Sequence, residues 1–171
     1  MRRLFFALWP DQNIRAQINA INLQINEHRL KKLRPTNLHT TLVFMGNVDE
    51  PSFLRLQQHA QAIRANAFTI TFDQLNYWQK PKILCLTCQR QPKEIYQLVN
   101  QLTDIVEAEG IDIEERPYRA HVTLARKASQ IETVSFTPVV WQVTEFVLAE
   151  SISTDKGVVY QVLARWPLQQ D

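Results

Sequence analysis

The chain has 171 residues, of which 45% are hydrophobic and 21% are charged, and these proportions are typical of soluble globular domains. Its formal net charge of +2 is too small to predict general affinity for nucleic acid. Only three residues are glycine and neither common type of glycine-rich phosphate loop is present, which argues against ATP or NAD binding through such loops. No apolar run approaches the roughly 20 residues that a membrane-spanning helix needs.

Residues 3–9 are apolar and β-prone, and they give the first predicted element. Two arginines precede this run, which gives it a superficial similarity to a signal peptide. The run is short, ends at Trp9-Pro10-Asp11 and has no small-residue cleavage site. We therefore predict a buried strand here, and a cytoplasmic protein that does not associate with membranes.

Spacings of three and four residues between apolar side chains predict three amphipathic helices. The first begins after Asp11 and extends for about 15 residues, and the third ends at Gly110, which is a typical helix stop. The apolar positions are Ile14, Ile18, Ile21 and Ile25 in the first helix, Phe53, Leu56, Ala60 and Ile63 in the second, and Ile95, Leu98, Leu102, Ile105 and Val106 in the third.

Stretches rich in β-branched and aromatic residues predict the remaining strands. These are HTTLVF from residue 39, AFTITFDQLNYW from 67, KILCLTCQ from 82, HVTLAR from 121, WQVTEFVLAE from 141 and VVYQVLARW from 158. A turn near 79–81 and the turn-forming run SISTDKG (151–157) separate neighbouring strands. Helices mixed with hairpins predict the α+β class, with antiparallel sheets.

One short unit, His-x-Thr-Leu, occurs twice, beginning at His39 and, 82 positions later, at His121. Because side chains alternate along a strand, His39 and Thr41 share one face, as do His121 and Thr123. Two such strands in related lobes would place two imidazoles and two hydroxyls around one cleft. One imidazole can act as a base while the other acts as an acid, and threonine hydroxyls suit phosphate oxygens. Such a site suits in-line displacement at phosphorus, and it can act on a cyclic phosphodiester without a metal ion because ring strain weakens the bond to be broken.

Basic residues gather beside both copies of the unit. Eight of the 19 lysines and arginines are Arg29, Lys31, Lys32 and Arg34 before the first copy, and Arg116, Arg119, Arg126 and Lys127 around the second. A single charge run commonly forms a solvated face. Two runs that flank the same motif favour an anionic ligand.

Other assignments of the histidines and cysteines are weaker. A zinc site on His39 and His121 lacks a further ligand at suitable spacing, and lone histidines in half-buried strands are commonly structural. His28 and His59 have no threonine partner and are predicted to face solvent on helical stretches. Cys85 and Cys88 form a CxxC, but they lie in a predicted strand and on opposite faces, so we interpret them as small apolar residues of a sheet.

The paired motifs resemble the two-histidine phosphoesterase superfamily, in particular the RNA 2′,3′-cyclic phosphodiesterases, which are also called 2′-5′ RNA ligases. The stretches RLFFALWP, LHTTLVFMGNV, RPYRAHVTLARK and SISTDKGVVYQVLARWPL are similar to that branch in the same order. The resemblance therefore covers essentially the whole chain. It implies that residues 1–171 form one bilobal domain, with two pseudo-symmetric lobes whose antiparallel sheets are flanked by helices around a central cleft.

The resemblance also implies roles for the four site residues. His39 would give a proton to the leaving oxygen and His121 would activate water, while Thr41 and Thr123 would hold the phosphate. The substrate would be RNA ending in a 2′,3′-cyclic phosphate, opened to a 2′-phosphate by a monomer that needs no cofactor or metal. Joining RNA ends through a 2′-5′ linkage is the reverse-type reaction.

Two positions depart from this pattern or stay open. The family commonly has proline before the second histidine, where this chain has Ala120, and the loss of a stiffening ring would loosen His121. Simple alternation places Arg126 on the far face of its strand, unless the strand ends or bulges there. Phe44 and Tyr118 are candidates for stacking on a base, or for the core. A small cyclic nucleotide as substrate, or binding of RNA ends without catalysis, are the alternative functions.

Overall fold

The computed structural model describes residues 1–27, 29–129 and 134–170, and its helices and antiparallel sheets confirm the predicted α+β class. The elements in chain order are β1 (Arg2–Leu8), α1 (Gln12–Gln24), β2 (Lys31–Lys32), the 3₁₀ helix η1 (Pro35–Asn37), β3 (Thr40–Val48), α2 (Glu50–Ala60), β4 (Phe68–Phe72), β5 (Gln74–Trp78), β6 (Ile83–Thr87), α3 (Lys93–Ala108), β7 (His121–Arg126), β8 (Val139–Val143), β9 (Glu145–Thr154) and β10 (Gly157–Pro167).

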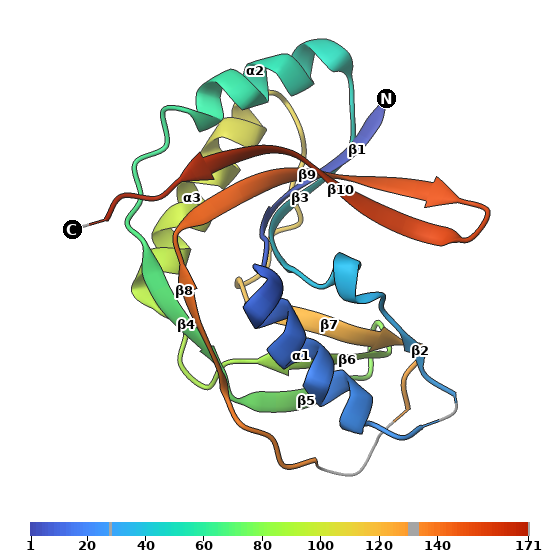
Figure 1. Cartoon of the computed structure of the whole chain (residues 1–171). Helices are drawn as coiled ribbons and strands as arrows, with labels where there is room; N and C mark the ends of the chain where they lie inside the picture. The colour runs from blue at the N-terminus through green and yellow to red at the C-terminus, as the bar shows by residue number, and fades with distance from the viewer. Residues whose placement is uncertain (28, 130–133, 171) are drawn as a thin grey trace.

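Two four-stranded sheets carry the two copies of the repeated motif (Figure 1). The first sheet has the order β10-β9-β1-β3, and the second has the order β2-β7-β6-β5. A separate two-stranded ribbon pairs β4 with β8. His39 of the first motif directly precedes the edge strand β3, whereas the motif at residue 121 lies on β7, inside the second sheet. The strand pairs within all three sheets are antiparallel.

Two helices, α1 and α3, each follow a strand of one large sheet in the sequence but pack against the other large sheet. Helix α1 follows β1 of the first sheet but lies beside the second sheet (Figure 1), where the side-chain amide of Asn22 donates to the carbonyl of Leu124 in β7 at 3.1 Å. Helix α3 lies between β6 and β7 in the sequence, yet it contacts β3 of the first sheet. One continuous core cluster accordingly takes side chains from both sheets, and burying them stabilises the arrangement of the two sheets together.

The helix ends follow the sequence signals. Asp11 caps α1 by accepting from the Ile14 amide at 2.8 Å, and Gly110, with φ of +74°, follows α3 in the left-handed conformation that glycine tolerates. The second helix is shorter than predicted, because α2 ends at Ala60 and Ile63 lies beyond it. None of the helices in the described part of the chain is long and apolar enough to cross a bilayer.

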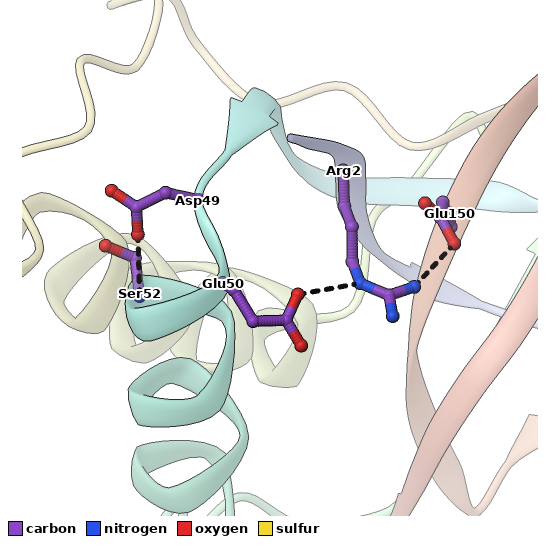
Figure 2. Close-up of polar contacts among 5 residues, drawn as sticks. All are labelled: Arg2, Asp49, Glu50, Ser52 and Glu150. Carbon is purple, nitrogen blue, oxygen red and sulfur yellow. Dashed lines mark hydrogen bonds and ion pairs between the residues drawn. The ribbon is translucent and has the colours of Figure 1, made fainter.

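Polar contacts join the N-terminal strand to α2 and β9 (Figure 2). The Arg2 guanidinium lies 3.2 Å from a carboxylate oxygen of Glu50 and 3.0 Å from one of Glu150, and its carbon lies 4.8 Å from the centre of the Phe53 ring. Asp49 caps α2 by accepting from the Ser52 amide at 2.8 Å. These contacts orient α2 against the first sheet, although half-exposed ion pairs stabilise a fold only modestly.

Three strand predictions need correction. The stretch from residue 67 is two strands in different sheets, because the chain turns at Asp73, whose carboxylate accepts from the Gln89 amide at 2.9 Å. The stretch from residue 141 divides at Thr144 into β8 and β9. Most of the predicted turn SISTDKG belongs to β9, and only Asp155 and Lys156 form the turn. Periodicity reports which residues alternate, but it does not report which sheet they join.

The isolated polar and thiol residues largely follow the predictions. Cys85 is a buried free cysteine in β6, as predicted, and Cys88 lies just beyond the strand, half-buried. His59 is exposed on α2, also as predicted. The prediction for His28 lies outside the described residues.

Candidate active site

A cavity of about 260 Å³ lies between the two large sheets and is lined by residues of both. The four residues singled out from the sequence, His39, Thr41, His121 and Thr123, all line it. The structure therefore brings together side chains that are 82 positions apart in the chain. One correction applies to His39, which directly precedes β3 and is not part of the strand.

The orientation of His39 is set by two hydrogen bonds. Its Nδ1 lies 2.7 Å from the Asn37 carbonyl oxygen, and because a carbonyl only accepts, Nδ1 carries the proton. Its Nε2 lies 2.9 Å from the Thr41 hydroxyl oxygen, so in the neutral ring Nε2 accepts from that hydroxyl. The nitrogen that exchanges protons is therefore the one beside a pocket hydroxyl.

His121 is held in the same way. Its Nδ1 lies 3.0 Å from the carbonyl oxygen of Arg119, which again lies two residues before the histidine. The proton is therefore on Nδ1, and the lone pair of the neutral ring is on Nε2. The second copy of the motif thus reproduces the tautomer of the first, and both rings line the same cavity.

A β-bulge follows each histidine–threonine pair. In the first sheet Ala7 pairs with Thr41 and Phe6 with Val43, which leaves Leu42 as the extra residue. In the second sheet Cys85 pairs with Thr123 and Leu84 with Ala125, which leaves Leu124 as the extra residue. An extra residue shifts the alternation of side chains by one position.

The bulges change which residues reach the pocket. Phe44 and Arg126 are each five positions after their histidine, and both line the cavity. Simple alternation therefore does not apply to Arg126, because the strand bulges at Leu124 and this bulge returns Arg126 to the face of His121. The carbonyl of Leu124 accepts from the Leu33 amide at 2.9 Å as well as from Asn22, so the bulge is hydrogen-bonded.

Only part of the two basic clusters reaches the pocket. Of the eight residues, Arg126 alone is among the described residues that line the cavity. The ammonium group of Lys32 instead donates to the carbonyls of Asn22 and Ile25 at 2.6 and 2.7 Å. A cationic residue that the sequence did not single out, Arg3 of β1, supplies the second guanidinium of the pocket lining.

Aromatic side chains pack against both imidazoles. Trp9 stacks on His39 with ring centres 5.3 Å apart, and Trp78 lies 4.6 Å from His121. Neither tryptophan was predicted, because each lies at a strand end far from its histidine in the sequence. Phe44 lines the pocket and is 47% exposed, whereas the Tyr118 hydroxyl donates to the Thr41 carbonyl at 2.7 Å.

Burial and nearby cations disfavour protonation of both histidines. Burial lowers the pKa of His39 to about 4, with smaller contributions from the charges of His121 and Arg126. Burial also lowers the pKa of His121, and Arg116, Arg119 and Arg126 act in the same direction. Both imidazoles are therefore neutral at pH 7 in the ligand-free pocket. Since Arg3 and Arg126 line the same cavity, the pocket favours an anion.

Binding of an anion is expected to raise the pKa of His39. A phosphate in the pocket stabilises the imidazolium form, so the pKa rises from about 4 in the free protein and protons are taken up on binding. An NMR titration of the His39 ring with and without inorganic phosphate measures this shift. Calorimetry near pH 6 in two buffers of different ionisation enthalpy measures the uptake, and binding with no uptake would contradict the prediction.

Asn37 anchors the histidine of the first motif. Its buried side-chain amide donates to the Val158 carbonyl at 2.9 Å and accepts from the Tyr160 amide at 3.1 Å. Its own carbonyl holds His39. The anchor therefore connects the orientation of His39 to β10, a strand at the other end of the chain.

Replacing Asn37 with alanine is expected to lower the free energy of unfolding by about 1–3 kcal/mol, because the hydrogen bonds to the Val158 carbonyl and from the Tyr160 amide are both lost. Denaturant unfolding of Asn37→Ala measures the loss. Asn47→Ala, at an exposed position of β3, is the matched control. Equal stability of the two variants would show that the anchor contributes nothing.

A pocket of this construction suits acid–base chemistry on an anionic phosphate ester, because proton-exchanging groups face it from two sheets and cations offset the charge of the ligand. Residues 10–155 match the 2′-5′ RNA ligase superfamily, and the chain belongs to this family. The match includes both histidine motifs.

Relatives of known name and solved structures match nearly the whole chain. The chain is 33% identical to the RNA 2′,3′-cyclic phosphodiesterase of Escherichia coli K12, covering 99% of this chain and 98% of that protein. It is 26% identical to the protein of the same name from Archaeoglobus fulgidus, covering 94% and 97%. Crystal structures of E. coli LigT, in apo form and complexed with 3′-AMP, are similar at TM-scores of 0.88 and 0.89 with 32% identity. The apo structure covers 99% of this chain and 98% of its own, and the complex covers 99% of both.

Proposed function

We propose that the protein hydrolyses the 2′,3′-cyclic phosphodiester at the end of an RNA to a 2′-phosphomonoester. The observation that carries this proposal is the pair of imidazoles with the same fixed tautomer in one cationic pocket, one directly before β3 and the other in β7. Two relatives that match over nearly the whole chain are named RNA 2′,3′-cyclic phosphodiesterase, and the complex of E. coli LigT with 3′-AMP agrees with a nucleotide ligand in this fold.

The mechanism we propose uses one histidine on each side of phosphorus. His121 takes a proton from water through Nε2, and the water oxygen forms a bond to phosphorus. The bond from phosphorus to O3′ breaks, and His39 gives its Nε2 proton to O3′. The product keeps the phosphate on O2′, and proton exchange with solvent restores both rings.

The substrate phosphate itself favours the protonated form of His39, which His39 needs in order to act as the acid. His39 is neutral in the free pocket because its pKa is about 4, so it must gain a proton to act as an acid. The phosphate anion favours that proton, as argued above. Thr41 and Thr123 would donate to the non-bridging oxygens and Arg126 would offset their charge, which are contacts that tighten as charge develops.

The test is a hydrolysis assay that identifies the product. An RNA oligonucleotide ending in a 2′,3′-cyclic phosphate is incubated with the protein in the presence of a chelator, and 2′- and 3′-phosphate ends are resolved. We expect a 2′-phosphate only. No turnover, or a 3′-phosphate product, would overturn the proposal. A cyclic mononucleotide assayed in parallel separates an RNA substrate from a small one, and addition of RNA with a 5′-hydroxyl end tests 2′-5′ ligation.

We further propose that residues 1–171 act as one bilobal unit, as a monomer in the cytoplasm. Helix α1 packs against the second sheet and α3 packs against the first, and these contacts between the sheets support a single unit. One chain also supplies both histidine motifs to its own cavity, so a second copy is not needed to complete the site.

A further inference from the structure

The three residues before His121 belong to no helix or strand and are held by a side chain from elsewhere. Gln91 lies just before α3, and its side-chain amide forms two hydrogen bonds with the backbone of this segment. The Gln91 side-chain oxygen accepts from the Ala120 amide, and its nitrogen donates to the Tyr118 carbonyl at 3.1 Å. The carbonyl between these two points, that of Arg119, is the one that holds Nδ1 of His121.

The same segment also reaches the first motif. The hydroxyl of Tyr118 donates to the backbone carbonyl of Thr41 at 2.7 Å. Burial raises the pKa of Tyr118 well above its usual value, so the hydroxyl keeps its proton and remains a donor across the neutral range. The segment 118–120 therefore joins two sets of contacts. Gln91 holds its backbone, and its Tyr118 side chain contacts the first histidine motif.

We propose that Gln91 is a positioning residue, which fixes the Arg119 carbonyl and thereby the tautomer and direction of the His121 ring. The inference rests on the proposed role of His121 in catalysis. Among the described residues that line the cavity Gln91 does not appear, so it acts through the segment and not on the substrate.

Residue 120 is an alanine with a buried backbone N–H, which explains why the hydrogen bonds from Gln91 are needed. Ala120 is buried, at 2% exposed, and its N–H would have no partner if Gln91 were absent from this place. A buried donor without a partner is unfavourable, and alanine leaves φ free where proline would restrict it. The hydrogen bonds of Gln91 satisfy the N–H and restrict the segment, whereas a proline would have no N–H to satisfy and would restrict φ through its ring.

The proposal predicts a specific pattern of kinetic effects. Gln91→Ala is expected to lower kcat by about 10- to 100-fold, because small displacements of a catalytic group are costly, while KM changes little. Gln91→Glu keeps the acceptor for Ala120 but loses the donor to Tyr118, so we expect an intermediate kcat. Gln89→Ala, at an exposed glutamine two positions earlier, is the matched control and should retain the full rate.

A double-mutant cycle with Ala120→Pro separates positioning from general loss of stability. In the wild-type background Ala120→Pro removes the bond to Gln91 and is expected to lower kcat. In the Gln91→Ala background the same change removes an unpaired N–H and restricts φ, so it is expected to raise kcat. If Ala120→Pro lowers kcat equally in both backgrounds, the proposal is wrong.

A second readout is independent of turnover. Nitrogen-15 NMR of the His121 ring reports which nitrogen carries the proton, and Gln91→Ala or Gln91→Glu should mix the two tautomers of His121 while leaving His39 unchanged. An unchanged His121 tautomer together with an unchanged kcat would overturn the inference. If His121→Ala retains full activity, the proposed mechanism fails, while the NMR result still decides whether Gln91 positions the ring.

Discussion

Replacing either His39 or His121 with alanine is expected to lower kcat by about 100- to 10,000-fold, the range that a positioned general acid or base contributes. Both rings line the same cavity, and each holds its Nδ1 on a backbone carbonyl, which leaves Nε2 for proton exchange. They lie on different segments, so neither can take over the role of the other. The measurement is the rate of 2′-phosphate formation from an RNA with a cyclic phosphate end. His59→Ala is the control, since this histidine is exposed on α2 and should retain the full rate.

The pH dependence gives the same pair a second signature. One ring must be neutral and the other protonated, so we expect bell-shaped profiles. The profile of kcat/KM reports the free enzyme, in which the pKa values of both histidines are lowered, so its optimum should lie below about 6.5, the ordinary pKa of histidine. The profile of kcat should lie at higher pH, because bound phosphate raises both pKa values. Flat profiles between about pH 5 and 9 would contradict a pair of histidines.

Arg126→Ala is expected to lower kcat/KM by about 100- to 1,000-fold, comparable to the loss of one donor that stabilises developing charge. The guanidinium lines the cavity beside both motifs. Arg126→Lys should recover only part of the loss, because an ammonium group does not offer the two parallel hydrogen bonds of a guanidinium. Arg64→Ala, at an exposed position outside the described cavity lining, should behave as the wild type.

Arg126→Ala should also shift the pH profile of kcat/KM, and this shift distinguishes an electrostatic effect on the histidines from a loss of substrate binding alone. The charge of Arg126 lowers the pKa of His39 and of His121, so its removal raises both values. The acidic limb of kcat/KM should therefore move to higher pH in Arg126→Ala. An unchanged profile would show that Arg126 does not act on the imidazoles electrostatically.

The sequence predicts the four central side chains because their spacing is local. Alternation within three residues places His39 with Thr41 and His121 with Thr123, and the structure puts all four on one cavity. The spacing of isoleucines after Asp11 likewise predicts α1, because both the cap and the buried face belong to one short segment. Such signals need no knowledge of what the segment packs against.

The features that the sequence did not predict depend on pairing between distant strands. A bulge exists only relative to a partner strand, so the inward direction of Arg126 required the register between β6 and β7. The contacts of Trp9 and Trp78 with the two histidines and the crossing of α1 to the second sheet likewise join segments that are far apart in the chain. The division at Asp73 was missed because two strands in different sheets share one apolar period.

The anchor of Asn37 also has a consequence for the order of folding. Strand β1 is central in its sheet, and its partner β9 includes Glu150, which pairs with Leu4. Beyond β9, Val158 and Tyr160 of β10 hold the residue that orients His39. Contacts between residues this far apart in sequence carry a loop-closure entropy cost, and domains rich in such contacts fold slowly. During synthesis the hydrogen bonds that fix Asn37, whose carbonyl holds His39, therefore form only after β10 has been made.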